Sequence, residues 1–82
     1  MSVTTTTEII YRAGHYNEAQ VTEITHSLAA MIDAEVESIA FDNSTEEWNV
    51  ELSTEISVAN VDLEIGDYII GMRGVTAYTY DD

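Results

Sequence analysis

Carboxylates are the residues of this sequence that occur often enough, and at regular enough spacing, to carry its chemistry. Sixteen Asp and Glu residues stand against two Arg residues and no Lys, which gives a formal net charge of −14. Residues on one face of a strand recur roughly every 6.7 Å, so Glu47, Glu51 and Glu55 are predicted to form a straight acidic row. We expect a partner-binding surface that comprises Glu46, Glu47, Glu51, Glu55, Asp62, Glu64 and Asp67.

A surface of this charge selects its partners by electrostatics. It repels DNA, RNA and anionic lipids, so we expect a basic protein as partner and no direct binding of nucleic acid or membranes. A compact chain of this length is about 30 Å across, and duplex DNA carries about eighteen charges over that distance. The sixteen carboxylates of the chain are comparable in number to these phosphate charges, so one hypothesis is that the protein imitates nucleic acid. A solvated acidic surface, as in halophilic proteins, is the other.

The candidate catalytic and metal-binding groups do not form a recognisable motif, so we expect neither an enzyme nor a cofactor. His26 lies one helical turn from Glu23, the geometry of a metal-binding pair, but two further ligands are not evident. The run that starts at Asp42 begins like a calcium loop, yet Glu47 stands where such loops need Gly and Ser53 where they need a bidentate Glu. A chain this short offers no obvious cleft that would raise the pKa of one carboxyl group of a pair.

One amphipathic helix is predicted from residue 17 to about residue 34, where apolar residues recur at helical spacing. Its apolar stripe consists of Val21, Ile24, Leu28, Met31 and Ile32. Asn17 is the predicted N-cap, Gln20 is its capping-box partner, and Glu18 complements the helix dipole. No Gly or Pro follows Ala34, so the helix end is placed where β-branched residues begin to favour an extended chain.

The segments before and after this helix predict short strands. The Thr-rich residues 1–7 lead into a first strand, although low complexity is an alternative interpretation of that stretch. A second strand at residues 36–42 places Ile39 and Phe41 inward, and residues 43–45 supply the chemistry of a hairpin turn.

The third strand, which starts near residue 46, has the clearest alternation in the chain. Its core face is formed by Trp48, Val50 and Leu52. A later apolar group is shifted by one residue and comprises Val61, Leu63 and Ile65. The shift predicts a turn at residues 59–60 before a further strand. Residues 66–67 predict another tight connection, and residues 75–80 form the last extended piece.

This element order predicts a single α+β domain over residues 1–82. We expect an antiparallel sheet of about four to five short strands with one amphipathic helix packed on one face, in the order β-α-β-β-β-β. The uncovered face of the sheet should be acidic. The sequence has no Cys, no basic leader and no apolar run near the roughly 18 residues of a membrane span, so we expect a cytoplasmic protein.

In size, acidity and lack of Lys and Cys, the chain resembles the small phage-encoded inhibitors of host defence, the anti-CRISPR and anti-restriction proteins, several of which imitate DNA. This resemblance is one of composition and spans the whole chain. A local resemblance concerns the Gly-Asp-Tyr-Ile-Ile run at residues 66–70, which is similar to a segment of small phage proteins that precedes a Gly-containing hairpin. Gly71 and Gly74 depart from the register of that hairpin.

The resemblance implies an inhibitor that acts in the host cytoplasm and blocks the DNA- or RNA-binding groove of a host defence complex. Its partner would be a basic nucleic-acid-binding protein. The residues leave open an alternative from another class, a haloadapted or viral structural domain whose acidity serves solubility. Such a domain could form a homodimer through an exposed strand edge.

Overall fold

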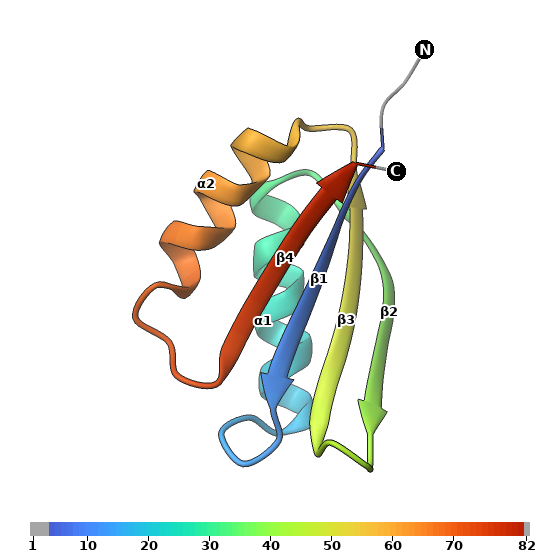
Figure 1. The fold of residues 1–82 in the computed structure, drawn as a ribbon, viewed down its shortest axis with the longest axis vertical. Coiled ribbons are helices and arrows are strands. Elements are labelled where there is room, and N and C mark those ends of the chain that lie inside the picture. The colour runs from blue at the N-terminus through green and yellow to red at the C-terminus, as the bar shows by residue number, and fades with distance from the viewer. Residues whose placement is uncertain (1–3, 82) are drawn as a thin grey trace.

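A computed structural model describes residues 4–81 as one four-stranded sheet with two helices on the same side (Figure 1). The elements in chain order are β1 (Thr5–Arg12), α1 (Glu18–Met31), β2 (Glu35–Asp42), β3 (Glu47–Thr54), α2 (Val58–Ile69) and β4 (Val75–Asp81). The predicted α+β class and antiparallel sheet are confirmed. The predicted order β-α-β-β-β-β and the single helix are wrong, because these residues form four strands and two helices in the order β-α-β-β-α-β.

The strands lie in the order β2-β3-β1-β4, and every neighbouring pair is antiparallel. A β-α-β-β-α-β chain with interleaved strands of this kind has the ferredoxin-like, or split βαβ, topology. Folds of this type support many unrelated functions, so function must be argued from the exposed side chains.

The start of α1 is confirmed in detail. The Asn17 side chain accepts a hydrogen bond from the Gln20 N–H, and the Gln20 side chain accepts one from the Asn17 N–H, both at 2.9 Å. The two residues therefore form the predicted capping box. Val21, Leu28 and Ile32 of the predicted stripe are fully buried, and Ile24 packs against the core, but Met31 is 39% exposed.

The helix ends at Met31, three residues before the predicted boundary, through a left-handed turn. Asp33 has φ 50°, and the N–H of Ala34 donates to the carbonyl of Ala29 at 2.8 Å. This is the bond of a Schellman motif, in which Gly is the usual residue with positive φ. Asp adopts this conformation more readily than most residues do, so Asp33 can terminate the helix although no Gly follows it.

The helix α2 replaces the fourth strand that was expected around residues 61–65. Val61 and Ile65 are 0% and 1% exposed, whereas Leu63 is 61% exposed. The buried residues are therefore spaced by four, and Ile69 continues the series. Three apolar residues at every second position fit a strand equally well, which is why the alternation misled the prediction.

Two connections expected near this segment are also corrected. Residues 59–60 lie in the first turn of α2 and not in a turn between strands. Gly66 and Asp67 lie inside the helix, and a Cβ atom at Gly66 would meet no atom within 4 Å. The last extended piece is confirmed as β4, and the first strand as β1, while the predicted residues 1–3 lie outside the described part of the chain.

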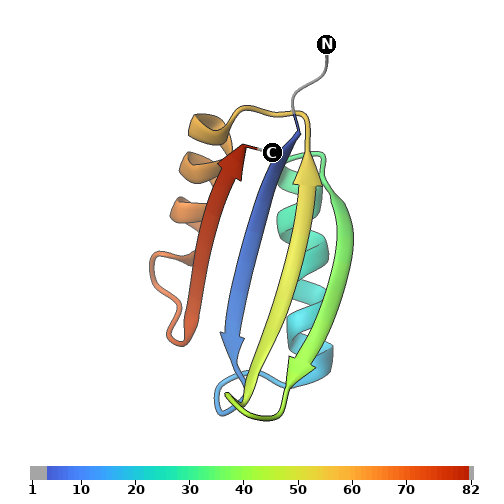
Figure 2. The ribbon, with the colours of Figure 1, turned by 45° about the vertical axis from the view of Figure 1, so that its right-hand side comes forward.

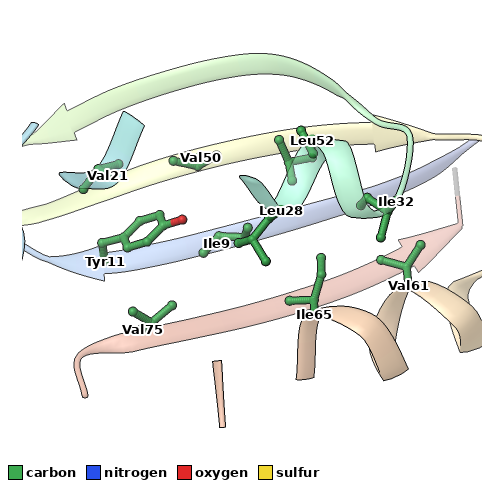
Figure 3. Close-up of a cluster of buried hydrophobic side chains, with 11 residues drawn as sticks. Ile9, Tyr11, Val21, Leu28, Ile32, Val50, Leu52, Val61, Ile65 and Val75 are labelled. Atoms are coloured by element: carbon green, nitrogen blue, oxygen red, sulfur yellow. The ribbon is translucent and has the colours of Figure 1, made fainter. Parts of the chain in front are cut away.

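The hydrophobic core lies between the sheet and the two helices (Figure 3). It consists of Ile9, Tyr11, Val21, Leu28, Ala29, Ile32, Val50, Leu52, Val61, Ile65 and Val75. The inward alternation of β3 is confirmed by Val50 and Leu52, which are 2% and 1% exposed. Phe41 lies on the inward side as predicted, because it is opposite Trp48 and Trp48 is opposite the buried Tyr11. Its side chain is nevertheless 42% exposed, with its ring 5.0 Å from that of Trp48.

One polar pair is enclosed in this core. The hydroxyl groups of Tyr11 and Thr25 lie 3.1 Å apart, within hydrogen-bond distance. Burial raises the pKa of Tyr11, and the hydrogen bond with Thr25 partly opposes that shift. Thr25 is fully buried on α1 although it was not part of the predicted stripe, because Tyr11 gives its hydroxyl a partner.

Candidate functional site

The face of the sheet opposite the helices is not covered by another element of the described chain (Figure 2). Residues directly opposite each other in a ladder point to the same side, so the register identifies the side chains of this open face. Apart from the bulge in β2, they are Glu35, Ser38, Ala40, Asp42, Glu47, Asn49, Glu51, Ser53, Thr6, Glu8, Ile10, Arg12, Thr76, Tyr78 and Tyr80.

Carboxylates dominate this open face. We call the set that comprises Glu8, Glu35, Glu37, Asp42, Glu47 and Glu51 the acidic face. Glu37 belongs to it although it lies at the bulge, because the hydroxyl of Ser53 donates to its carboxylate at 2.6 Å. Arg12 is the only basic residue of the described chain that shares this face.

The centre of the acidic face contains two like charges side by side. Glu8 of β1 lies directly opposite Glu51 of β3 in the ladder. The Cβ atoms at such positions lie about 5 Å apart, and like charges directly opposite each other in a ladder are destabilising. The isolated chain therefore keeps an unfavourable arrangement at this point, which a cation between the two carboxylates would relieve.

A shallow hollow lies beside this pair. Its volume is about 220 Å³, and it is lined by Glu8, Ile9, Ile10, Ser38, Ala40, Asn49, Val50 and Glu51. Small side chains at Ser38 and Ala40 leave room next to the two carboxylates. A flat guanidinium group fits such a place better than an ammonium group does, because its donors form a planar fork that matches carboxylates.

Tyrosine side chains border the acidic pair on its other side. Tyr78 lies directly opposite Glu8 in the β1–β4 ladder and is 65% exposed. Its ring lies 5.5 Å from the ring of Tyr80. Aromatic faces attract guanidinium groups, so the row Ser38, Glu51, Glu8, Tyr78 offers both charge and stacking to an Arg side chain.

The same row is unsuited to bases of nucleic acid. Single-stranded RNA is often bound on a four-stranded sheet whose central strands expose aromatic residues for stacking. Here the central strands β1 and β3 expose Glu8, Glu47 and Glu51 instead. Phosphates would be repelled at this face.

The turn between β2 and β3 closes one end of the acidic face. The Asp42 carboxylate accepts hydrogen bonds from the Ser44 N–H at 2.9 Å and the Ser44 hydroxyl at 2.7 Å. The hydroxyl contact is the largest cause of the lowered pKa of Asp42. Glu46 in the same turn has φ 56°, and its carbonyl accepts a hydrogen bond from the Ala13 N–H.

The seven residues predicted to form the binding surface do not all meet. Glu47 and Glu51 lie on the acidic face, Glu46 in the adjoining turn, and Glu55 is exposed just beyond the end of β3. The other three, Asp62, Glu64 and Asp67, lie on α2, in the layer on the opposite side of the sheet. They cannot extend the acidic row, because the segment that carries them is a helix and not the next strand.

Sequence reasoning missed four residues of the acidic face, Glu8, Glu35, Glu37 and Asp42. Glu8 had a usable signal, because it alternates with the core residues Thr7 and Ile9. The others lie in β2, where the bulge between Val36 and Ser38 interrupts the alternation.

Metal-binding geometry is not found in residues 4–81, which contain no group of three or more His, Cys, Asp or Glu side chains able to hold an ion. His26 lies exposed on α1, and His15 lies in the β1–α1 connection next to Gly74. Within the same range, none of the helices has the length and apolar character needed to cross a membrane.

Comparisons with known proteins do not add an assignment. No protein-family model matches the chain, and no curated protein matches its sequence.

Proposed function

We propose that the acidic face binds the positively charged nucleic-acid-binding groove of another protein and competes there with DNA or RNA. The observation that carries this proposal is the pair Glu8 and Glu51, opposed across two central strands beside a hollow and the exposed Tyr78. Like charges opposed in a ladder reduce stability. Functional surfaces retain such arrangements because binding a partner of opposite charge relieves them.

The amount of charge is of the right order for such competition. The described chain measures 40 × 23 × 18 Å. Duplex DNA carries about 24 charges over 40 Å, about half of them on the side that faces a bound protein. The six carboxylates of the acidic face, with Glu46 and Glu55 at its ends, approach that density. The compositional resemblance to phage-encoded inhibitors favours a groove that belongs to a host defence complex, with action in the host cytoplasm.

The second candidate function, a haloadapted structural domain, is supported by the carboxylates on the helix layer. Carboxylates also lie on the helix layer, on α1 at Glu18 and Glu23 and on α2 at Asp62, Glu64 and Asp67. A surface that is acidic on both sides is what a haloadapted structural domain would have, with acidity serving solubility and not one partner.

Two double variants with the same change in charge test the first proposal. Glu8→Gln with Glu51→Gln neutralises the central pair, and Glu23→Gln with Glu64→Gln is the matched control on the helix layer. Each protein serves as bait in lysate of a candidate bacterial host at about 0.15 M salt, with and without added duplex DNA. We expect the native chain and the control to capture nucleic-acid-binding proteins that DNA displaces, and the central variant to capture at least tenfold less.

The central variant should also unfold at a higher urea concentration than the native chain, because it removes the repulsion between the two carboxylates. Loss of binding with a gain in stability is a combination that misfolding cannot produce. Equal capture by both variants, or capture that DNA does not displace, would contradict the proposal. Thermal melts across a salt series test the second candidate, which requires a fold that forms only at molar salt.

A further inference from the structure

The strand β4 forms one edge of the sheet, because β1 is its only neighbour in the strand order. Its residues from Val75 to Tyr80 include no charged side chain, and its ladder with β1 runs without a bulge from Val75 to Asp81. Proteins usually protect edge strands against pairing with charges, Pro or bulges. From Val75 to Tyr80, β4 has no charged residue, no Pro and no bulge.

The backbone of this edge is ready to pair. The Arg12 N–H donates to the Gly74 carbonyl at 2.8 Å, and hydrogen-bonded pairs alternate along an antiparallel ladder. The N–H and carbonyl groups of Val75, Ala77 and Thr79 therefore point away from β1. No backbone group elsewhere in residues 4–81 bonds to them.

The helix beside this edge exposes apolar side chains. Packed against β4, α2 lies behind it and reaches past its outer side in Figure 2. Leu63 on this helix is 61% exposed, and Ile70 at its C-terminal end is 85% exposed. A second α2 brought alongside would allow such residues to leave water, at about 25 cal/mol for each Å² of apolar area buried.

We propose that the occupant of this edge is a second copy of the chain, paired antiparallel through β4 about a two-fold axis near Tyr78. This register uses all seven residues of β4, and the N–H of Ala77 donates to the carbonyl of Thr79 of the second copy. A two-fold axis makes the contact isologous, as in most homodimers.

Charge complementarity favours a second copy over an unrelated strand. At −14, two copies repel each other over most of their surfaces. The strand β4 itself is the exception, because its residues 75–80 carry no charge, Arg73 precedes it and the exposed Asp81 ends it, although α2 beside it carries Asp62, Glu64 and Asp67. Antiparallel pairing brings Arg73 near Asp81 of the second copy at both ends of the interface.

This dimer goes beyond the function proposed above and does not depend on it. A two-fold axis perpendicular to the sheet keeps both acidic faces on the same side. The result is one eight-stranded sheet in which the two acidic faces flank an uncharged central pair of β4 strands, while the helices of both copies share the other side.

The absence of Cys from the chain allows a direct test. A Tyr78→Cys variant places two thiols opposite each other across the axis, at a non-hydrogen-bonded pair where the Cα atoms lie about 4.5 Å apart. That separation lies within the range of disulfides. We expect the variant to form a covalent dimer in oxidised glutathione. Ala40→Cys on the opposite edge strand, also exposed and on the same face, is the control and should remain monomeric.

Sedimentation equilibrium of the Cys-free protein supplies the second measurement. We expect a mass of twice the 9.1 kDa chain at micromolar concentration, with tighter association at 0.5 M salt because salt screens the repulsion. Tyr78→Glu should weaken the dimer at least tenfold, whereas Ala40→Glu adds the same charge and should not. A native chain that stays monomeric at millimolar concentration, or equal cross-linking at both Cys positions, would overturn the proposal and leave β4 to a strand of another protein.

Discussion

The two edge strands belong to one sheet, yet β2 and β4 present opposite surfaces to a neighbouring molecule. β2 carries Glu35, Glu37 and Asp42 and is bent by a bulge. β4 carries no charge from Val75 to Tyr80 and pairs without interruption. A chain with a net charge of −14 has thus kept carboxylates off one edge while concentrating them at the other. Charge and irregularity oppose strand pairing at β2, and neither opposes it at β4.

The two edges also differ in what supports them on the helix side. β4 rests on α2, whose residues Val61 and Ile65 are almost fully buried. β2 contributes Ile39, which is only partly buried, and Phe41, which is exposed. The edge that is ready to pair is therefore also the one held in place by a dedicated helix.

Removal of this support should have the largest effect on stability. Ile65→Ala leaves a cavity between α2 and β4 and should lower the free energy of unfolding by about 2 to 4 kcal/mol. Ile39→Ala under β2 removes a side chain that is already partly solvated, and should cost about 1 kcal/mol. Urea unfolding followed by circular dichroism measures both values. Equal losses would mean that α2 does not support its edge more than α1 supports the other.

A smaller difference is expected at the residues that lead into the two edge strands. Asp33 before β2 and Gly74 before β4 both have positive φ, at 50° and 75°. A Cβ atom at Gly74 would lie 2.8 Å from Cδ2 of His15. Gly74→Ala should therefore cost about 1 to 2 kcal/mol, whereas Asp33→Gly should be neutral or stabilise by about 0.5 kcal/mol.

Melting temperatures of the two variants give the comparison. His15→Ala in the Gly74→Ala background separates the clash from the backbone strain, because it removes the contact and leaves φ unchanged. A Gly74→Ala protein as stable as the native chain would show that the β4 connection is looser than its geometry indicates.

The difference between the two helices explains how far sequence alone could predict this fold. The signals of α1 are local, since Asn17 and Gln20 form the capping box and lie three residues apart. α2 has no such signal, because Ser57 makes no side-chain cap and the exposed Leu63 completes a false alternation. Only packing against β4 decides between strand and helix there, and that contact is not local.

The acidic face also shows that local patterns can be predicted from the sequence, whereas contacts between distant strands cannot. Glu47 and Glu51 could be placed because the alternation of β3 is local. The opposition of Glu8 and Glu51 could not, because it depends on a strand pairing across 43 positions of the chain, and the register of that pairing is visible only in the folded sheet.

The smallest expected effect concerns acid stability at the turn that joins β2 to β3. The pKa of Asp42 is lowered in the fold, chiefly by the Ser44 hydroxyl. A carboxyl group whose folded pKa is depressed contributes stability that is fully present above its unfolded pKa and is lost as pH falls through the folded value. Asp42→Asn can keep the turn without a charge, so its stability relative to the native chain should rise as pH falls below about 4.

Comparing Asp42→Asn with the native chain separates the contribution of the Asp42 carboxylate from that of the other carboxylates. Acidification also weakens the mutual repulsion of the other carboxylates, which stabilises both proteins alike and cancels in the difference. Urea midpoints at steps between about pH 6 and pH 2.5 supply the measurement. Asp81→Asn at the exposed end of β4 is the matched control, because it removes one carboxylate of the same type away from the turn, and its curve should run parallel to that of the native chain. A parallel curve for Asp42→Asn as well would mean that the turn at β2 gains no stability from its charge.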